Sequence, residues 1–273
     1  MKKIALIGSG TSAIGFLVRL LKQSPKNIII DCFEQGKALQ ERIQNNDVIT
    51  GFGGAGTFSD GKLSLSSEIG GDICDLIGNN KYEDYIDEVV QLWTRGKKVE
   101  KANLTDDRVK RLELDFRQNN LMLRLSDFYH IGTDLLQEVL NEIEEELKTK
   151  SDVVRFHFND FFDFDKIDDY DYTIIASGRY DNKSSHEIQK LLSRLNIDYK
   201  ENKIDIGIRY EVPSEITDWL TDLLYEFKVL GYSETEELVR TFCVNPKGYV
   251  VGEGGNDFSL VNGHSFLNKK SKN

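Results

Sequence analysis

The chain has 273 residues, which is enough for one large domain or for two ordinary ones. Apolar residues make up 39% of the sequence, so a sizeable core can form and disorder is not expected. The formal net charge of -11 repels nucleic acid and anionic membrane surfaces, which argues against binding to either.

Cysteine usage and the start of the chain bear on the compartment. Cys32, Cys74 and Cys243 are far apart and form no C-x-x-C motif, which argues against a zinc site, a dithiol redox pair or a disulfide framework. The first residues resemble a secretory signal, but polar residues between Gly8 and Ser12 interrupt the apolar run. No segment approaches the roughly 18 apolar residues that a membrane span needs. We therefore expect a cytoplasmic protein.

In chain order, the first predicted elements are a strand, a glycine turn and a helix. Lys3–Ile7 is a short apolar run of strand type, and Gly8–Ala13 (GSGTSA) follows it as a turn. Ile14–Lys22 then has apolar residues at helical spacing. This order is typical of the first unit of a dinucleotide-binding sheet, the alternatives being a flavodoxin-like turn or a purely structural one.

Each residue of the turn has a physical role in that interpretation. Gly8 permits the tight turn, Gly10 lets the backbone approach a pyrophosphate, and the small Ala13 lets the helix pack on the strand. The helix N-terminus, which includes Thr11 and Ser12, then offers N–H groups and a positive dipole end to the phosphates. The turn is therefore a candidate cofactor-binding segment.

A second strand and an acidic residue follow at the spacing that such a site requires. Asn27–Phe33 (NIIIDCF) predicts a buried parallel strand that ends at Glu34, next to Gln35. Glu34 comes about 20 positions after Ala13, the spacing of a carboxylate that accepts hydrogen bonds from a ribose hydroxyl. This motif alone does not distinguish FAD from NAD.

A second glycine-rich segment, Gly51–Lys62 (GFGGAGTFSDGK), predicts a loop pressed against a flat or anionic ligand. The alternative is a flexible surface loop, for which Phe52 and Phe58 would be poor choices. The segment has no Walker A register, because Leu63 follows the Gly-Lys pair. The candidate ligand-binding residues in it are Gly53, Gly54, Gly56, Ser59, Gly61 and Lys62.

Two further strands are expected between residues 153 and 178. Val153–Phe158 alternates as a strand does, and Tyr172–Gly178 (YTIIASG) predicts a buried strand that ends in small residues. Small residues at a carboxyl end suit the crevice where ligands bind in open α/β sheets, so we include Ala176, Ser177 and Gly178 in the candidate site.

The segment between these strands, Asp160–Asp171, is rich in Asp and Phe, and we expect it to form a hairpin connection. Its acidic residues lack the register and the terminal Glu of a calcium-binding loop. No metal site is predicted.

Candidates for acid/base or nucleophilic chemistry each have a structural alternative, so the catalytic residue stays unknown. The candidates are His130, His186, His264, Lys62 and Cys243.

His186 lies in a segment where Ser184 and Glu187 form a capping box, which indicates a helix start. His130 precedes Thr133, the expected N-cap of a helix over Asp134–Lys148. A lone cysteine such as Cys243 is more often a small buried hydrophobe.

These segments, in this order, resemble the bacterial family of uncharacterised FAD-dependent dehydrogenases over nearly the whole chain. The resemblance rests on GSGTSAIGF with FEQGK, GFGGAGTFSDGKLSLS, HIGTDLL, IIASGR, IDIGIRYEVP, RTFCVNPKGYVV and VNGHS. It implies an FAD held across Gly8, Gly10, Ala13 and Glu34, with the second glycine loop and the 176–178 strand end beside it. It also implies hydride transfer to or from a small-molecule substrate, with NAD(P)H as a possible electron donor.

The expected architecture is an α/β protein with a Rossmann-like parallel sheet that binds FAD or NAD(P). The predicted domains are an FAD-binding domain over residues 1–79 and 152–181, a helical insertion over 80–151, and a second α+β domain over 182–273. A helix after Pro213 should pack on the sheet of that second domain.

Relatives in this family are longer, and this chain ends at KKSKN soon after VNGHS. We therefore expect a second domain that is incomplete at the C-terminus and a flavin pocket that lacks part of its wall. A non-catalytic nucleotide-binding relative and an NAD-dependent enzyme are the alternatives to the flavin enzyme. Oligomeric state cannot be predicted.

Overall fold

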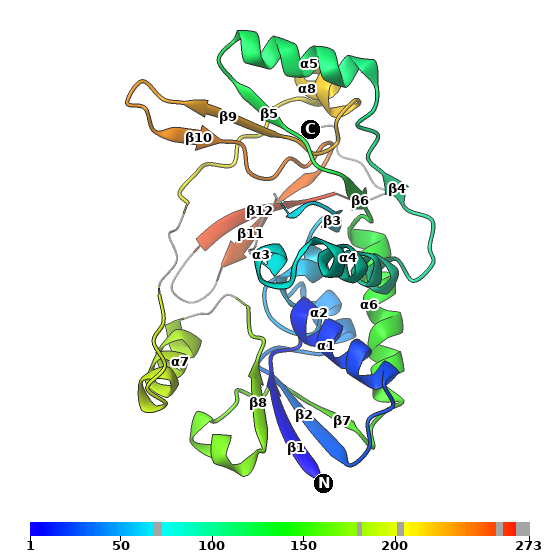
Figure 1. Cartoon of the computed structure of the whole chain (residues 1–273), viewed down its shortest axis with the longest axis vertical. Coiled ribbons are helices and arrows are strands. Elements are labelled where there is room, and N and C mark those ends of the chain that lie inside the picture. Colours follow the sequence, from blue (N-terminus) through cyan, green and yellow to red (C-terminus); the bar gives the residue numbers. More distant parts are fainter. Residues whose placement is uncertain (68–72, 179–181, 201–204, 255–258, 266–273) are drawn as a thin grey trace. The chain divides into compact units, whose positions relative to one another are not determined.

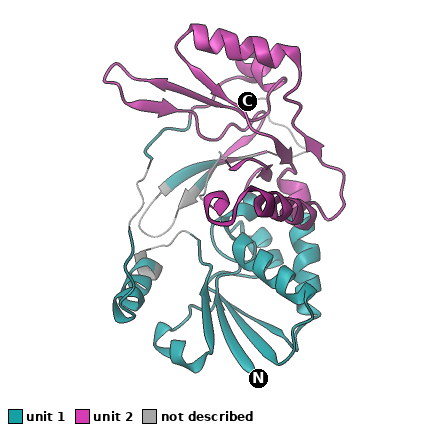
Figure 2. Ribbon diagram, viewed as in Figure 1, with its two compact units in different colours: residues 1–58, 137–209, 252–262 teal, residues 59–136, 210–251, 263–273 magenta. Residues whose placement is uncertain are grey.

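The computed structural model describes residues 1–67, 73–178, 182–200, 205–254 and 259–265. The chain divides into two compact units, coloured separately in Figure 2. Unit 1 comprises residues 1–58, 137–209 and 252–262, and unit 2 comprises residues 59–136, 210–251 and 263–273. Among the described residues, no helix is long and apolar enough to cross a membrane.

Unit 1 contains a four-stranded parallel sheet, in which the strands lie in the order β7-β2-β1-β8 (Figure 1). The strands are β1 (Lys2–Ile7), β2 (Ile28–Glu34), β7 (Val154–Phe158) and β8 (Tyr172–Ile175). The chain is thus an α/β protein, as the sequence predicts, and all four strands predicted for this sheet are present. The fourth differs from the prediction of a buried strand: β8 ends at Ile175, and Tyr172 and Ile175 are exposed because β8 lies at an edge of the sheet.

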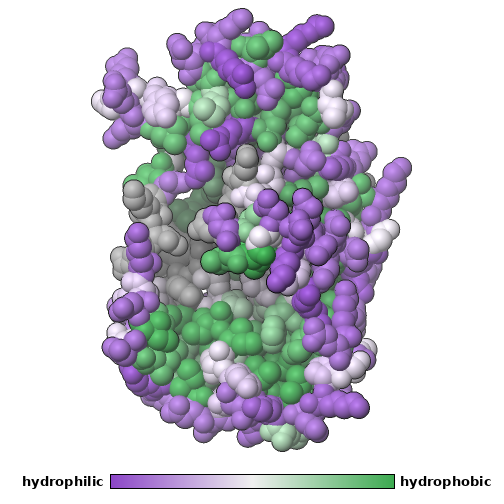
Figure 3. Space-filling view, in the orientation of Figure 1, coloured by the Kyte–Doolittle hydropathy of each residue, from purple (hydrophilic) through white to green (hydrophobic). Residues whose placement is uncertain are grey.

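The sheet is the centre of the core of unit 1. Ala5 and Ile7 of β1 pack with Phe162 and Ile188, among others, in one buried cluster. Because side chains alternate along a strand, the buried Leu6 points to the opposite face. Apolar side chains (green in Figure 3) gather around this sheet on the face that the figure shows.

The expected hairpin over Asp160–Asp171 is wrong. Strand β7 pairs with β2 and strand β8 pairs with β1, so the two strands lie on opposite edges of a parallel sheet. Parallel strands need a crossover rather than a tight turn, and the segment contains a 3-10 helix, η3 (Phe164–Asp169). Its aromatic residues Phe162 and Phe164 are buried in the crossover, which explains their presence in an otherwise acidic segment.

Helices of unit 1 surround the sheet and its loops. They are α1 (Thr11–Lys22), α2 (Leu39–Asn45), the 3-10 helix η1 (Gly54–Phe58) and α7 (Asn182–Arg194). Helix α6 (Thr133–Lys148) begins in unit 2 and continues in unit 1. Ser184 lies inside α7 rather than before it, so it is not the cap that the sequence predicts.

Unit 2 contains two small antiparallel sheets, β3-β6-β4 and β10-β9-β5. Their strands are β3 (Lys62–Ser64), β4 (Glu100–Lys101), β5 (Met122–Arg124), β6 (Phe128–His130), β9 (Lys228–Tyr232) and β10 (Leu238–Arg240). The helices are α3 (Ile73–Ile77), α4 (Asn79–Thr94), α5 (Asp107–Gln118) and α8 (Ser214–Thr221). A further strand pair, β11 (Tyr249–Gly254) with β12 (Ser259–His264), has residues in both units.

The segment 80–151 is not purely helical, in contrast to the prediction. It carries β4, β5 and β6 as well as α4, α5 and α6. These short strands form through pairing with other segments: β6 pairs with β3 and β4, and β5 pairs with β9. The compact units also differ from the predicted domains, since residues 59–79 group with unit 2 and residues 182–209 with unit 1.

The helix after Pro213 packs as predicted, although it ends at Thr221. Leu220 of α8 belongs to a buried cluster that includes Leu123 of β5, and the partly buried Val229 of β9 packs against that cluster. The apolar face of the helix therefore lies against the β10-β9-β5 sheet.

Two glycines near the N-terminus should respond oppositely to alanine. A Cβ at Gly15 in helix α1 meets nothing within 4 Å, so Gly15→Ala should raise the free energy of unfolding by about 0.5–1 kcal/mol. A Cβ at Gly8 would lie 2.7 Å from the Ala176 carbonyl oxygen at a φ of +97°, so Gly8→Ala should lower it by at least about 2 kcal/mol. Denaturant melts measure both, and equal effects would contradict the described turn.

Candidate functional site

The glycine turn lies where the carboxyl ends of three strands meet. The backbone N–H of Gly8 donates to the carbonyl of Phe33 at the end of β2, 2.8 Å away. On its other side Gly8 packs so closely against Ala176 and Ser177, just after β8, that no Cβ would fit. The structure therefore brings the turn, the end of β2 and two of the predicted strand-end residues together.

Glu34 is buried at this edge and accepts four hydrogen bonds from the chain. Its Oε2 accepts from the backbone N–H and the hydroxyl of Ser9 at 2.9 and 2.8 Å. Its Oε1 accepts from the N–H groups of Gly36 and Gly51 at 2.8 and 3.0 Å. A carboxylate offers about four acceptor positions, so protein donors fill those that the sequence assigned to a ribose hydroxyl.

The second glycine loop lies directly against the first turn. The N–H of Gly53 donates to the carbonyl of Ser9 at 2.9 Å, and a Cβ on Gly54 would come within 3.1 Å of the Cα of Gly10. Phe52 and Phe58 are buried, so the segment up to Phe58 is not a solvated surface loop. The backbone of this segment therefore packs closely on the first turn, and its predicted contact with a ligand stays a prediction.

Arg42 of helix α2 hydrogen bonds to the second glycine loop, and the sequence did not point to this residue. Its fully buried guanidinium donates to the carbonyls of Phe52 and Gly54 at 2.5 and 3.0 Å and to the Thr57 hydroxyl at 2.8 Å. Burial lowers the pKa of Arg42 to about 10, against the opposing effect of the nearby Glu34 carboxylate. Arg42 follows the apolar Leu39 at helical spacing, on the face of α2 that is buried.

The N-terminus of helix α1 has no side-chain cap. Gly10 is its N-cap, and the first turn contains no acidic residue. The first N–H bonded within the helix is that of Ile14, which donates to the carbonyl of Gly10. The N–H groups of Ser12 and Ala13 therefore point out of the helix end, where an anion is stabilised, and that of Thr11 lies beside the bridge between Gly10 and Gly53.

A small cavity of about 50 Å³ opens beside the turn at the ends of the strands. Ser177 lines it, and its buried hydroxyl has no hydrogen-bond partner among the described residues. The remaining lining residues are Ile7, Gly8, Phe33, Glu34, Gln35, Asp160, Phe161, Phe162, Phe164 and Ile188. Gln35 thus lines the same cavity as its neighbour Glu34.

The other predicted site residues lie elsewhere or at the margin. A Cβ on Gly56 would be 3.4 Å from the Thr11 side chain, so Gly56 also adjoins the first turn. Gly178 has a φ of +66° and nothing within 4 Å of its Cβ position. Ser59, Gly61 and Lys62 belong to unit 2.

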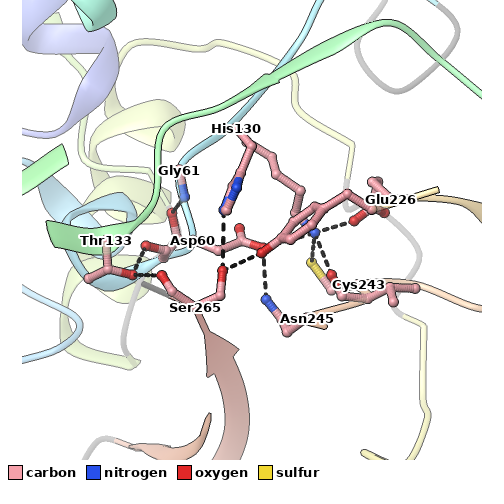
Figure 4. Close-up of polar contacts among 12 residues, drawn as sticks. Asp60, Gly61, His130, Thr133, Glu226, Cys243, Asn245 and Ser265 are labelled. Carbon is pink, nitrogen blue, oxygen red and sulfur yellow. Dashed lines mark hydrogen bonds and ion pairs between the residues drawn. The ribbon is translucent and has the colours of Figure 1, made fainter. Parts of the chain in front are cut away.

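Lys62 contacts a buried polar cluster in unit 2, of which Figure 4 labels Asp60, Glu226, Cys243 and Asn245. Its Nζ lies 3.0 Å from Asp60 Oδ2 and 2.7 Å from the carbonyl oxygen of Val244, and it also pairs with Glu226. Asn245 donates to the same Asp60 oxygen at 2.8 Å. Burial lowers the pKa of Lys62, but the two carboxylates more than offset this and leave its pKa raised, so the amine is cationic.

A chain of hydroxyl and imidazole groups adjoins this cluster. Ser265 Oγ lies 3.2 Å from His130 Nε2 and hydrogen bonds to the Tyr225 hydroxyl, and the rings of His130 and Tyr225 stack 4.0 Å apart. Burial raises the pKa of Tyr225, so its hydroxyl stays protonated. Thr133, the expected helix cap, instead donates its hydroxyl to the carbonyls of Ser59 and Ser265.

The cluster gathers Lys62, His130 and Cys243 from the predicted acid/base candidates. Cys243 Sγ lies 3.9 Å from Lys62 Nζ, and burial raises the pKa of its thiol. His186 lies in helix α7 of unit 1, and the side chain of His264 is outside the described residues. No local pattern in the sequence pointed to the other members of the cluster, which are Asp60, Tyr225, Glu226, Asn245 and Ser265.

No family model and no solved structure matches this chain. An uncharacterized protein of Clostridium beijerinckii is 23% identical over 300 aligned positions. The alignment covers 96% of this chain and 48% of that protein, so the chain spans about half the length of the curated relative that it matches.

The Glu34 hydrogen bonds can be tested with Glu34→Gln. The NH2 group of the amide would face either the N–H of Ser9 or the N–H groups of Gly36 and Gly51, so the free energy of unfolding should fall by about 2–3 kcal/mol. Glu41→Gln is the matched control, because the Glu41 side chain is half exposed and its ion pair with Lys37 is long, at 3.9 Å. This variant should change the free energy of unfolding by less than about 0.5 kcal/mol. Unfolding in guanidinium compares the stability of the two variants. Equal changes would show that the four hydrogen bonds to Glu34 do not stabilise the fold.

Removal of the Lys62 charge should be costly. In Lys62→Met, Asp60 and Glu226 would remain buried without their cation, so unfolding free energy should fall by about 3–5 kcal/mol. Lys101→Met removes an exposed ion pair to Asp127 and should cost less than about 1 kcal/mol. A Lys62→Met protein as stable as the control would show that the cluster does not depend on this lysine.

Proposed function

We propose that this chain is the nucleotide-binding part of an FAD-dependent oxidoreductase. The observation that carries the proposal is the order of the parallel strands. Numbered as they occur along the chain, the four strands lie in the order third, second, first, fourth. These are the first four strands of the six-strand order 3-2-1-4-5-6 of doubly wound dinucleotide-binding sheets, where the ligand crosses the carboxyl end of the first strand.

The phosphate side of such a site is supported by the α1 terminus. Gly10 leaves the backbone uncovered, and a Cβ there would be no nearer than 3.8 Å to the Cα of Gly54. The N–H groups of Ser12 and Ala13 are not used within the helix. These residues would hold a pyrophosphate through backbone donors and the helix dipole.

The adenosine side fits with one adjustment. Of the four donors to Glu34, only the Ser9 hydroxyl can rotate away without moving the backbone, so a ribose hydroxyl can replace it. The unpaired Ser177 hydroxyl supplies another hydrogen-bonding group in the same cavity. A cavity of about 50 Å³ holds only one or two waters, so side chains such as Phe161 must move to admit an adenine ring.

FAD is proposed over NAD on the resemblance carried by the two glycine segments. When bound, the flavin would supply hydride-transfer chemistry, with a small-molecule substrate and NAD(P)H as the proposed electron donor. The role of this chain is to position the dinucleotide: Arg42 and Glu34 fix both glycine loops through buried hydrogen bonds. Lys62, His130 and Tyr225 of unit 2 are the groups on which acid/base chemistry would be sought.

The proposal is tested by cofactor binding to the purified chain. FAD should bind with flavin fluorescence quenching and should raise the melting temperature. Gly10→Ala should weaken FAD binding at least about 10-fold, because its methyl group fits the fold but occupies the surface that a pyrophosphate approaches. Gly15→Ala, in the same helix, should bind FAD as the parent chain does.

Other outcomes separate the alternatives. Stabilisation by NAD without any by FAD would replace the flavin by a nicotinamide cofactor. Equal FAD affinity in the parent chain and in Gly10→Ala would place the ligand away from this turn. Stabilisation by neither dinucleotide would contradict the proposal and favour a non-catalytic relative.

A further inference from the structure

Unit 2 has a cleft of about 400 Å³ between helices α5 and α8, separate from the buried polar cluster. Its volume is in the range of sites for small molecules. Helix α5 lines it with Arg108, Arg111, Leu112 and Asp115, and helix α8 with the turn after it contributes Asp218, Trp219, Asp222 and Leu223. Leu112 and Leu223 also pack against the core behind the helices, so the cleft has an apolar component with charged residues around it.

Trp219 presents an aromatic surface in this cleft. Its side chain is 63% exposed, in contrast to Trp93, which is 6% exposed. The indole N–H donates to the carbonyl of Ile216 at 3.0 Å, so its hydrogen-bonding group is satisfied within α8. The ring face is what the residue offers to a ligand, and a flat aromatic ligand stacks on such a face.

Arg111 supplies an available positive charge. In the part of unit 2 that the structure describes, its guanidinium forms no hydrogen bond and no ion pair, whereas Arg108 pairs with Asp106 at 2.7 Å. In a chain of net charge -11, an arginine without a carboxylate partner is suited to an anionic ligand. A guanidinium binds a carboxylate through two parallel hydrogen bonds.

The acidic side of the cleft narrows the ligand further. Lys247 lies 3.3 Å from Asp218 and 3.1 Å from Asp222, so one cation is shared between two carboxylates. The Asp218 oxygen that Lys247 contacts, Oδ1, is buried, but the side chain as a whole is 34% exposed. The two carboxylates that share one cation disfavour a doubly charged phosphate, and the exposed part of the Asp218 carboxylate offers an acceptor to an N–H donor.

We propose that this cleft binds a small aromatic carboxylate that also carries an amino group. Its ring stacks on Trp219, its carboxylate pairs with Arg111, and its amino group donates to Asp218. The site is independent of the dinucleotide site in unit 1 and does not rest on the function proposed above.

The probe is 2-aminobenzoate, added to the ¹⁵N-labelled chain while the two indole N–H signals are followed by NMR. The Trp219 signal should shift in a saturable manner, and the Trp93 signal should not. Arg111→Gln should weaken binding at least about 10-fold. Arg117→Gln, on the same helix but outside the cleft lining, should bind as the parent does.

Three ligands related to the probe test the three contacts. Cyclohexanecarboxylate lacks the aromatic ring, aniline lacks the carboxylate and benzoate lacks the amino group, so each should bind more weakly than 2-aminobenzoate. Adenosine monophosphate binding more tightly than 2-aminobenzoate would overturn the assignment in favour of a nucleotide. Absence of any shift, or equal affinity in Arg111→Gln with an unchanged melting temperature, would overturn the site itself. FAD titration of the same variants keeps a failure here distinct from a failure of the dinucleotide proposal.

Discussion

The buried carboxylate of Glu34 is the interaction on which the candidate dinucleotide site depends. It joins three backbone segments that are far apart in the chain: the turn at Ser9, the bend at Gly36 and the start of the second loop at Gly51. Because each donor is a backbone N–H or a short hydroxyl, the carboxylate determines the path of the main chain rather than the pose of flexible side chains. The N-terminus of helix α1 at Thr11 is positioned by the same hydrogen bonds, because it follows Ser9 closely in the chain.

Arg42 complements Glu34 without forming an ion pair with it. The guanidinium donates to main-chain carbonyls of the second loop, while the carboxylate accepts from main-chain N–H groups of both loops. Each buried charge is therefore solvated by peptide dipoles, and each lies near enough to the other for mutual stabilisation. Such a paired arrangement fixes loop geometry before any ligand arrives, which lowers the entropic cost of binding.

Local patterns were sufficient for the parallel sheet and insufficient for unit 2. Strands β1 and β2 contain the apolar runs IALI and III, as strands covered on both faces do, and the glycine turn between β1 and α1 has a defined chemistry. The short strands β5 and β9 carry no comparable signal, since they pair across a long stretch of chain that includes much of unit 1. The hairpin expected after β7 failed for a related reason: strand direction depends on pairing partners that the segment itself does not specify.

The same distinction applies to the site residues. The turn residues and Glu34 were found because their spacing is set by one βαβ unit. Lys62 and His130 were noticed by residue type alone, and their contact with Tyr225 and Ser265 depends on segments that converge only in the folded unit. Arg42 was missed because an arginine on a short polar helix normally lies in solvent.

The interleaving of the two units has a consequence for how the protein is made. Ile4 of the first strand pairs with Tyr172 of β8, and residues between them build much of the other unit. During synthesis, β1 therefore cannot pair with β8 until more than half of the chain has left the ribosome. High separation between pairing strands slows folding, so one edge of the first strand stays unpaired while the intervening chain is being made.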